Sequence, residues 1–355
     1  MNFMNNNIVV LCGYQGSGKD SLASLLQIQG YEFIISHTTR PMRCNETQGN
    51  PYHFISKEEF LSTKDDFIEY RSYNTLVDNI PETWYYGVKK GAVKPDKKYV
   101  VVLDKQGLED FKKEFGNRVK SFYIEVNDDI RKQRAIARGS FDETEFNRRE
   151  IEDKKNFKGI ETEFIVKNNE ELIDSFKYML NVLKYINYQF SYPEIQKLFK
   201  AALTVIPKHF YQVGASSTGK RHVSISHGYG GLLIHSLLAT DIARDLCEVY
   251  NVNRYNKEII ILATLLHDIS KRGNDEIPTP HSLRNHPSLA VEQLNKVWED
   301  NGLTKLVKSG IVSHMGQWGN YPVKTLIQEI VHISDYLSSR KTLDSYFNQE
   351  RTVAL

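Results

Sequence analysis

Short apolar runs alternate with amphipathic helical patterns along residues 7–185. Three of the runs have the length and apolar composition of buried parallel strands: IVVLCG (8–13), KYVVVLD (98–104) and SFYIEV (121–126). Apolar residues recur at helical spacing in DSLASLLQI (20–28) and in EELIDSFKYMLNVLKYI (170–186), which closes the series. This alternation predicts an α/β unit, a parallel sheet flanked by helices.

From about residue 190 the pattern becomes helical. Long helical stretches follow one another without strand signals between them: GLLIHSLLATDIARDLCEVY (231–250), KEIIILATLLHDISK (257–271) and TLIQEIVHISDYLSSR (325–340). Pro193 in YINYQFSYPEI (185–195) interrupts the pattern before them. We therefore expect two domains, residues 1–187 and residues 188–355, the second of them all-α.

Composition narrows the class of protein. With 40% hydrophobic and 25% charged residues, each half of the 355-residue chain can bury an ordinary core. Lys plus Arg (46) nearly equals Asp plus Glu (44), which argues against a dedicated nucleic-acid binder without excluding nucleic acid as a substrate. The three scattered cysteines indicate reduced thiols and a cytoplasmic protein. The start of the chain lacks a signal-peptide pattern, and no stretch approaches the roughly 18 apolar residues of a membrane span.

The segment GYQGSGKDS (13–21) has the three parts of a phosphate-binding loop. A strand pattern precedes it, glycines allow backbone N–H groups to converge on an anion, and a helix begins directly after it. It predicts binding of ATP with Mg²⁺ through these residues: Gly13, Gly16, Ser17, Gly18, Lys19, Asp20 and Ser21. Lys19 would reach the terminal phosphates. Asp20 stands where such loops normally have a Ser or Thr that ligates Mg²⁺, so the protein ligand of the metal stays open.

Further motifs follow the loop in a fixed order: ISHTTRPMR (35–43), YHFISKEEF (52–60), FIEY (67–70), YYG (85–87) and VLDKQG (102–107). In order and spacing they resemble the guanylate kinase family over about residues 7–185. The resemblance implies an acceptor-phosphate site made of Ser36, Arg40, Arg43, Tyr52 and Tyr86. It implies that Glu69 and Asp104 read the base, and that the lid segment 131–150 supplies three catalytic arginines, Arg134, Arg138 and Arg149.

The residue roles that the resemblance implies agree with the chemistry of the ligands. Guanidinium forks and hydroxyls grip a monophosphate, and carboxylates accept from the N1–H and 2-amino donors of guanine. Two features depart from the family pattern. Val88 stands where the family has a hydroxyl near the guanine O6, and the loop RSYNTLVDNIPETW (71–84) is longer than usual. The expected acceptor is therefore GMP, dGMP or another deoxynucleoside monophosphate.

The second half holds nine of the eleven histidines. Six polar residues lie in or beside apolar helical segments: His235, His267, Asp268, His286, His314 and Asp335. Buried imidazoles and carboxylates need partners, and a shared divalent metal satisfies several at once. A single such histidine is more often an ordinary core residue, but a series spread over four helices is not easily explained in that way.

The order of these residues resembles HD-domain metal-dependent phosphohydrolases over about residues 195–345. The resemblance implies that His235, His267, Asp268 and Asp335 bind a catalytic metal, with His286 and His314 serving a second metal or a substrate phosphate. Such ligands suit Mn²⁺, Fe²⁺, Co²⁺ or Mg²⁺. Lys271 would neutralise a phosphate. Met315 stands where two-metal relatives often have a histidine, so one or two metals stay open, and His332 is an alternative ligand.

A second glycine segment, GASSTGKRH (214–222), also follows the phosphate-loop pattern as far as Lys220. No clear strand precedes it and no helix opens after it, so we do not expect it to bind a nucleotide in that way. It is similar to a segment ahead of the first metal-binding helix in some HD-domain proteins. In that reading Lys220 and His222 take a substrate phosphate near the metal. A surface loop packed on the helical domain is the alternative.

The leading hypothesis is a bifunctional enzyme of nucleotide metabolism, in which an ATP-dependent nucleoside monophosphate kinase is fused to a phosphohydrolase that acts on a nucleotide. In one alternative, the first half is a nucleotide sensor that regulates the hydrolase. In another, the helical half is a nuclease or an RNA-end-processing enzyme. The oligomeric state is left open by the sequence.

Overall fold

The computed structural model describes residues 8–42, 46–50, 52–77, 80–94, 96–137, 139, 141–217 and 222–340. The chain forms two compact units, Met1–Lys177 and Tyr178–Leu355, and the division falls inside helix α6 (Leu172–Ile186). The domain boundary expected at 187/188 lies just beyond the end of that helix.

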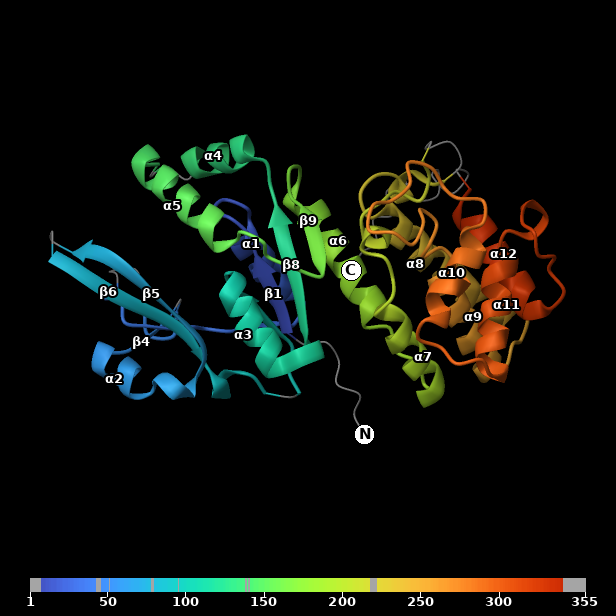
Figure 1. Cartoon of the computed structure of the whole chain (residues 1–355), viewed down its shortest axis with the longest axis horizontal. Helices are drawn as coiled ribbons and strands as arrows, with labels where there is room; N and C mark the ends of the chain where they lie inside the picture. The colour runs from blue at the N-terminus through green and yellow to red at the C-terminus, as the bar shows by residue number, and fades with distance from the viewer. Residues whose placement is uncertain are drawn as a thin grey trace, which may run out of the picture. The chain divides into compact units, whose positions relative to one another are not determined.

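The first unit is built on a parallel sheet with the strand order β2-β7-β1-β8-β9 (Figure 1). Its strands are β1 (Ile8–Cys12), β2 (Glu32–Phe33), β7 (Tyr99–Val102), β8 (Val119–Glu125) and β9 (Phe164–Lys167). All described pairings in this sheet are parallel. Strand β1 pairs with β7 on one side and β8 on the other, and it is buried along its whole length. The predicted α/β fold class is confirmed, and the strands lie within one or two residues of the apolar runs that predicted them.

A second sheet of the first unit has the order β4-β3-β6-β5. Its strands are β3 (His37–Thr38), β4 (His53–Phe54), β5 (Phe67–Val77) and β6 (Ile80–Lys89). Strands β5 and β6 pair antiparallel in a long hairpin, so residues expected to form an extended loop are largely strand (Figure 1). The segment is rich in Tyr, Thr, Val and Trp, whose side chains favour a pleated surface.

Helices surround these sheets and begin at capping residues. The helices of this unit before α6 are α1 (Lys19–Ile28), α2 (Lys57–Ser62), α3 (Lys105–Phe115), α4 (Asp128–Ala137) and α5 (Glu143–Asn156). The side chains of Ser56, Asp104 and Asp142 accept the N-terminal backbone N–H groups of α2, α3 and α5. The cap at α3 matters for the site, because it fixes Asp104 directly after strand β7.

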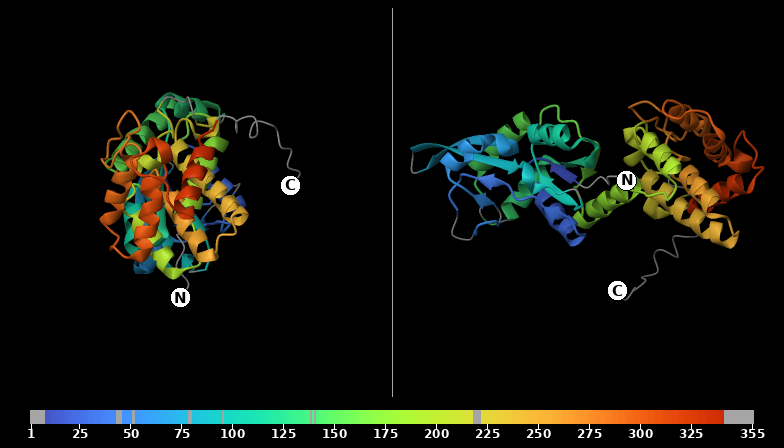
Figure 2. Two further views of the ribbon diagram at one scale, coloured as in Figure 1. Left: turned by 90° about the vertical axis from the view of Figure 1, so that its right-hand side faces the viewer. Right: turned by 90° about the horizontal axis from the view of Figure 1, so that it is seen from below.

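The second unit is a helical bundle, as predicted (Figure 2). After the end of α6 its α-helices are α7 (Pro193–Leu203), α8 (Gly231–Val249), α9 (Arg254–Leu266), α10 (His286–Asn295), α11 (Gly302–Ser313) and α12 (Leu326–Ser338). Helix α9 packs against α8, α11 and α12, and every residue from Ile259 to Leu266 is buried. Among the helices that the structure describes, none has the length and apolar content needed to cross a bilayer.

Candidate functional site

The glycine loop between β1 and α1 has the backbone conformation that phosphate binding requires. Gly13, Gly16 and Gly18 have φ values of 154°, 73° and 88°, and only glycine adopts such angles without strain. A Cβ atom at Gly18 would lie 2.6 Å from the Nδ2 atom of Asn168, which itself donates to the backbone oxygen of Ser17 at 2.8 Å. The loop is therefore held in shape by the residue that follows strand β9, and it leads directly into the N-terminus of α1.

The side chains of the loop differ in where they lie. Lys19 Nζ donates to the backbone oxygen of Tyr14 at 3.2 Å and lines the adjacent pocket. The Ser17 hydroxyl is buried and has no hydrogen-bond partner among the described residues. Asp20 and Ser21 are exposed in the first turn of α1 and are not among the pocket-lining residues.

A pocket of about 1370 Å³ in the first unit collects most of the predicted nucleotide-binding side chains. The predicted residues that line it are Gly13, Lys19, Ser36, Arg40, Tyr52, Glu69, Tyr86, Asp104 and Arg149. They come from both sheets and from helix α5, and segments far apart in the sequence thus meet around one cavity. The pocket is large enough to hold a nucleotide beside a second phosphate-bearing molecule.

The phosphate end of this pocket is cationic and aromatic. Arg40 forms an ion pair with Glu46 at 2.8 Å and lies over the ring of Tyr52, 5.6 Å from its centroid. Tyr52 and Tyr86 meet edge to face at 5.6 Å. A phosphate oxygen entering here would compete with the Glu46 carboxylate for the guanidinium fork.

The base end holds both predicted carboxylates, together with an arginine that the sequence analysis missed. Burial raises the pKa of Glu69 to about 7, against the lowering effect of the nearby Arg71 guanidinium. Arg71 Nε donates to Asp104 Oδ2 at 2.9 Å. Val88 is fully buried in the core beneath, so it offers nothing to the pocket.

Helix α5 lies over the phosphate loop. The backbone N–H of Gln15 donates to the Asp153 carboxylate at 2.7 Å, and the Gln15 side chain donates to the backbone oxygen of Phe146 at 2.7 Å. Arg148 and Arg149 both line the pocket; sequence reasoning named only Arg149. A carboxylate thus occupies one of the loop donors, and two arginines of the same helix line the pocket.

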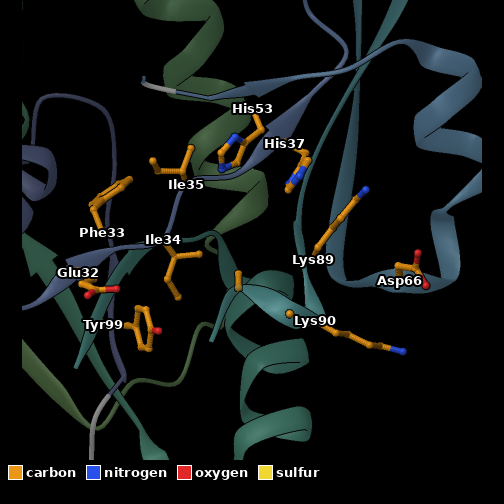
Figure 3. A pocket seen from close by; sticks show the side chains of 12 residues that line it. Glu32, Phe33, Ile34, Ile35, His37, His53, Asp66, Lys89, Lys90 and Tyr99 are labelled. Atoms are coloured by element: carbon orange, nitrogen blue, oxygen red, sulfur yellow. The ribbon is translucent and has the colours of Figure 1, made fainter. Parts of the chain in front are cut away.

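A further pocket of about 610 Å³ lies elsewhere in the first unit (Figure 3). It is lined by apolar residues near β2 and by His37, His53, Lys89 and Lys90. The rings of His37 and His53 lie 4.9 Å apart, and burial lowers the pKa of His37 to about 4. None of the predicted site residues that the structure describes lines this pocket.

In the second unit, four histidines direct their Nε2 atoms toward two carboxylates. The first group is His235, His267, Asp268 and Asp335, and the second is Asp268, His286 and His314. The His235 Nε2 atom lies 3.0 Å from Asp335 Oδ1 and 3.3 Å from Asp268 Oδ2. The Nε2 atom of His286 lies 3.0 Å from Asp268 Oδ1 and 3.0 Å from the Nε2 atom of His314. Asp268 therefore belongs to both groups, with one oxygen directed to each.

The Nδ1 atom of every one of these histidines is occupied. Nδ1 donates to the carbonyl of Thr264 in His267, of Leu283 in His286 and of Ile311 in His314, at 2.6, 2.6 and 2.7 Å. His235 Nδ1 lies 3.2 Å from the Ser338 hydroxyl, which donates to the Asp335 backbone oxygen and so accepts from the ring. Whenever such a ring is neutral, these partners leave its Nε2 lone pair facing the centre.

The charges of the cluster suit a cation. Burial alone would lower the pKa of His267. The carboxylates of Asp268 and Asp335 together have a larger, opposite effect and raise this pKa to about 10. Burial alone would raise the pKa of Asp268, yet Lys271 and His267 hold it well below its usual range. Asp268 Oδ1 accepts no hydrogen bond from the described residues. Facing lone pairs, ionised carboxylates and an unsatisfied buried oxygen fit one or two divalent metals.

The remaining predicted residues of the second unit lie beside this cluster or outside the described chain. The His222 ring meets the His235 ring edge to face at 4.9 Å, and neither of its nitrogens has a partner among the described residues. Lys271 Nζ lies 2.5 Å from Asp268 Oδ2. Lys220 is outside the described residues. Before it, Lys208–Tyr211 form a 3-10 helix instead of a strand, which agrees with the expectation that 214–222 is no nucleotide-binding loop.

Comparison with known proteins matches both units. A family model described as "Guanylate kinase" matches residues 5–184, just over half of the chain. The chain belongs to the guanylate kinase family. A second model, described as "HD domain", matches residues 232–340. The chain thus combines a unit of the guanylate kinase family with a second unit that matches an HD domain.

Individual relatives resemble the kinase unit. The guanylate kinase of Helicobacter pylori (strain J99) is 32% identical over 208 residues, which cover 56% of this chain and 97% of the relative. That of Helicobacter hepaticus is 31% identical over 202 residues, covering 54% and 95%. A solved guanylate kinase from Anaplasma phagocytophilum aligns with a TM-score of 0.37 and 19% identity, over 52% of this chain and 88% of that one.

Of the arginines predicted for the lid that the structure describes, Arg149 lines the pocket and Arg134 does not. Arg134 donates to the backbone oxygens of Asn168 and Glu170, and it is not among the residues that line the nucleotide pocket. Arg43 and Arg138 lie outside the described residues. Arg71 and Arg148 are pocket residues that sequence reasoning missed, and the strand alternation that places Arg71 beside Glu69 could have indicated the first of them.

Proposed function

We propose that this protein is a bifunctional enzyme that phosphorylates a nucleoside monophosphate with ATP and hydrolyses a phosphate ester, a nucleotide, at a separate metal site. GMP and dGMP are the reference acceptors, with other deoxynucleoside monophosphates as alternatives. The observation that carries the kinase half is the pocket that joins Lys19 to Arg40 and Glu69. The observation that carries the hydrolase half is the set of Nε2 atoms facing Asp268 and Asp335.

In the kinase half, the loop glycines and Lys19 hold the ATP phosphates, and bound Mg²⁺ would balance their charge. Arg40, Tyr52 and Tyr86 hold the phosphate of the acceptor. Arg149, with Arg148 beside it, stabilises the charge of the transferred group, because both project from α5 into the same pocket. Catalysis here consists of positioning two phosphates in line and neutralising their repulsion.

In the hydrolase half, His235, His267, Asp268 and Asp335 would hold one divalent metal, and His286 and His314 a second one that shares Asp268. Bound there, a divalent metal lowers the pKa of a water molecule that attacks phosphorus. His222, beside His235, is placed to hold a substrate oxygen. Lys271 keeps Asp268 ionised, which preserves a metal ligand.

One chromatographic experiment tests both halves. The full-length protein is incubated with Mg²⁺ or Mn²⁺ and each common NMP and dNMP, with and without ATP. A diphosphate formed only with ATP, and lost in Lys19→Ala, supports the kinase. A nucleoside formed without ATP, and lost in Asp268→Ala, supports the hydrolase.

The same variants address the alternatives. If no acceptor is phosphorylated and Lys19→Ala changes the rate of hydrolysis, the first unit is a nucleotide sensor. The contact between Asp153 and the Gln15 N–H gives that reading a structural basis, because nucleotide binding would displace it. Hydrolysis of oligonucleotides that weakens steeply with salt would instead indicate a nuclease.

A further inference from the structure

Arg71 lies in the pocket beside the two carboxylates that are predicted to bind the base. It lies on β5 two residues after Glu69, hence on the same side of the strand, and it lines the nucleotide pocket. Its Nε donates to Asp104 Oδ2 at 2.9 Å and its Nη2 to Asp104 Oδ1 at 3.0 Å, a two-pronged ion pair. Its Nη1 lies 3.8 Å from Glu69 Oε2. One guanidinium therefore contacts both carboxylates expected to bind the base.

The hydrogen-bonding capacity of Asp104 is nearly used up by these contacts. A carboxylate has about four lone-pair sites. Asp104 Oδ1 accepts from the backbone N–H of Gly107 at 2.8 Å, as the cap of α3, and from Arg71 Nη2. Asp104 Oδ2 accepts from Arg71 Nε, so one site remains. A donor on a base can use both oxygens of Asp104 only if Arg71 moves away.

Guanine presents three hydrogens on its donor edge, one on N1 and two on the 2-amino group. Glu69 can accept the N1 hydrogen and one amino hydrogen side by side. The second amino hydrogen needs another acceptor, and Asp104 is the neighbouring carboxylate in the pocket. With Asp104 bound to Arg71, that hydrogen can use only the one remaining site on Asp104 Oδ2, next to the guanidinium cation. The buried Val88 adds no hydroxyl for the O6 atom.

We propose that Arg71 sets the base specificity of the acceptor pocket: by occupying most of Asp104 it weakens the preference for a 2-amino group. A base with one ring N–H beside a carbonyl and no amino group on that edge, such as hypoxanthine or thymine, is then accepted about as well as guanine. This inference rests on the proposed kinase function.

The test compares kcat/KM for GMP and for IMP, two acceptors that differ only in the 2-amino group. Full-length wild type, Arg71→Met and Arg71→Lys are measured with saturating Mg-ATP. Arg118→Met is the matched control, a half-buried arginine after α3 that is not among the pocket residues. We expect a GMP/IMP ratio below about 10 in wild type and in the control. In Arg71→Met the ratio rises about tenfold or more, because Asp104 regains a charge-assisted hydrogen bond to the amino group.

Arg71→Lys keeps the charge without the planar fork, so its ratio should lie between those of wild type and Arg71→Met. If Arg71→Met does not fold, Arg71→Lys still tests the proposal. A wild-type ratio above about 100 that neither variant changes would overturn the role of Arg71 while leaving the kinase function intact. Absence of any diphosphate product in wild type would instead overturn the kinase function, and the inference with it.

Discussion

The buried carboxyl group of Glu69 makes the stability of the kinase unit depend on pH. We consider the substitution Glu69→Gln, which keeps the shape of the side chain and removes its ionisation. Glu69 is only 7% exposed, and burial raises its pKa from 4.5 to about 7. At about 1.4 kcal/mol for each pH unit, this difference corresponds to roughly 3 kcal/mol.

The sign follows from proton binding. Between pH 4.5 and about 7 the folded protein keeps a proton on Glu69 that the unfolded chain has released. The folded state is therefore favoured at acidic pH, and this contribution is lost as the pH rises through about 7. Glu69→Gln should leave the free energy of unfolding unchanged near pH 4.5 and increase it by up to about 3 kcal/mol at pH 8.

Hydrogen exchange of the amides in β1, followed by mass spectrometry at pH 5 to 8, measures the opening of this unit separately from the helical unit. Glu114→Gln, an exposed change on α3, is the control and should alter stability by less than about 0.5 kcal/mol at any pH. A stabilisation by Glu69→Gln that is independent of pH, or one confined to acidic pH, would contradict the reasoning.

Three further outcomes follow from the two sites. Asp268→Ala should abolish hydrolysis and leave kinase turnover within about twofold; loss of both activities would indicate misfolding instead. Ser338→Ala frees His235 Nδ1, so metal affinity measured by calorimetry should fall about 10-fold to 100-fold, and saturating metal should restore hydrolysis. Asp153→Asn weakens the hydrogen bond between the Gln15 N–H and the side chain that competes with a phosphate for it. KM for ATP should therefore fall about threefold with little change in kcat. An unchanged KM would show that α5 moves away from the loop at no cost in free energy.

The features that sequence predicted best are those encoded in one short segment. The phosphate loop requires a strand, positive-φ glycines and a helix start within about twenty residues, and Gly16 and Gly18 have that backbone conformation. Strand β1 was equally visible, because a strand that is buried on both faces of a sheet is apolar at nearly every position. Both features can be recognised without knowing which distant segments of the chain contact them.

Arg71 could not be predicted in the same way, because its role depends on a residue 33 positions away. The hairpin was expected as a loop, and only its strand register places Arg71 opposite Tyr86. The cap of α3 then brings Asp104 to it. Sequence reasoning identified the departure at Val88 but did not identify Arg71, which lies on the paired strand β5 and lines the pocket.

The metal cluster was only partly predictable from the sequence. Its histidines divide into two kinds. His267 and His314 end helices α9 and α11, and His286 begins α10; each donates Nδ1–H to the carbonyl three residues before it. Their tautomers are thus set locally, since carbonyls near helix ends lack intrahelical partners.

His235 lies inside helix α8, where the preceding carbonyls are already bonded, and it takes its partner Ser338 from α12. The orientation of His235 therefore depends on the packing of α12 against α8, which also positions Asp335. A substitution that loosens α12 should weaken the group containing His235 before it affects the pair formed by His286 and His314. The first metal position is coupled to the fold of the bundle, whereas the second is largely set by its own helix ends.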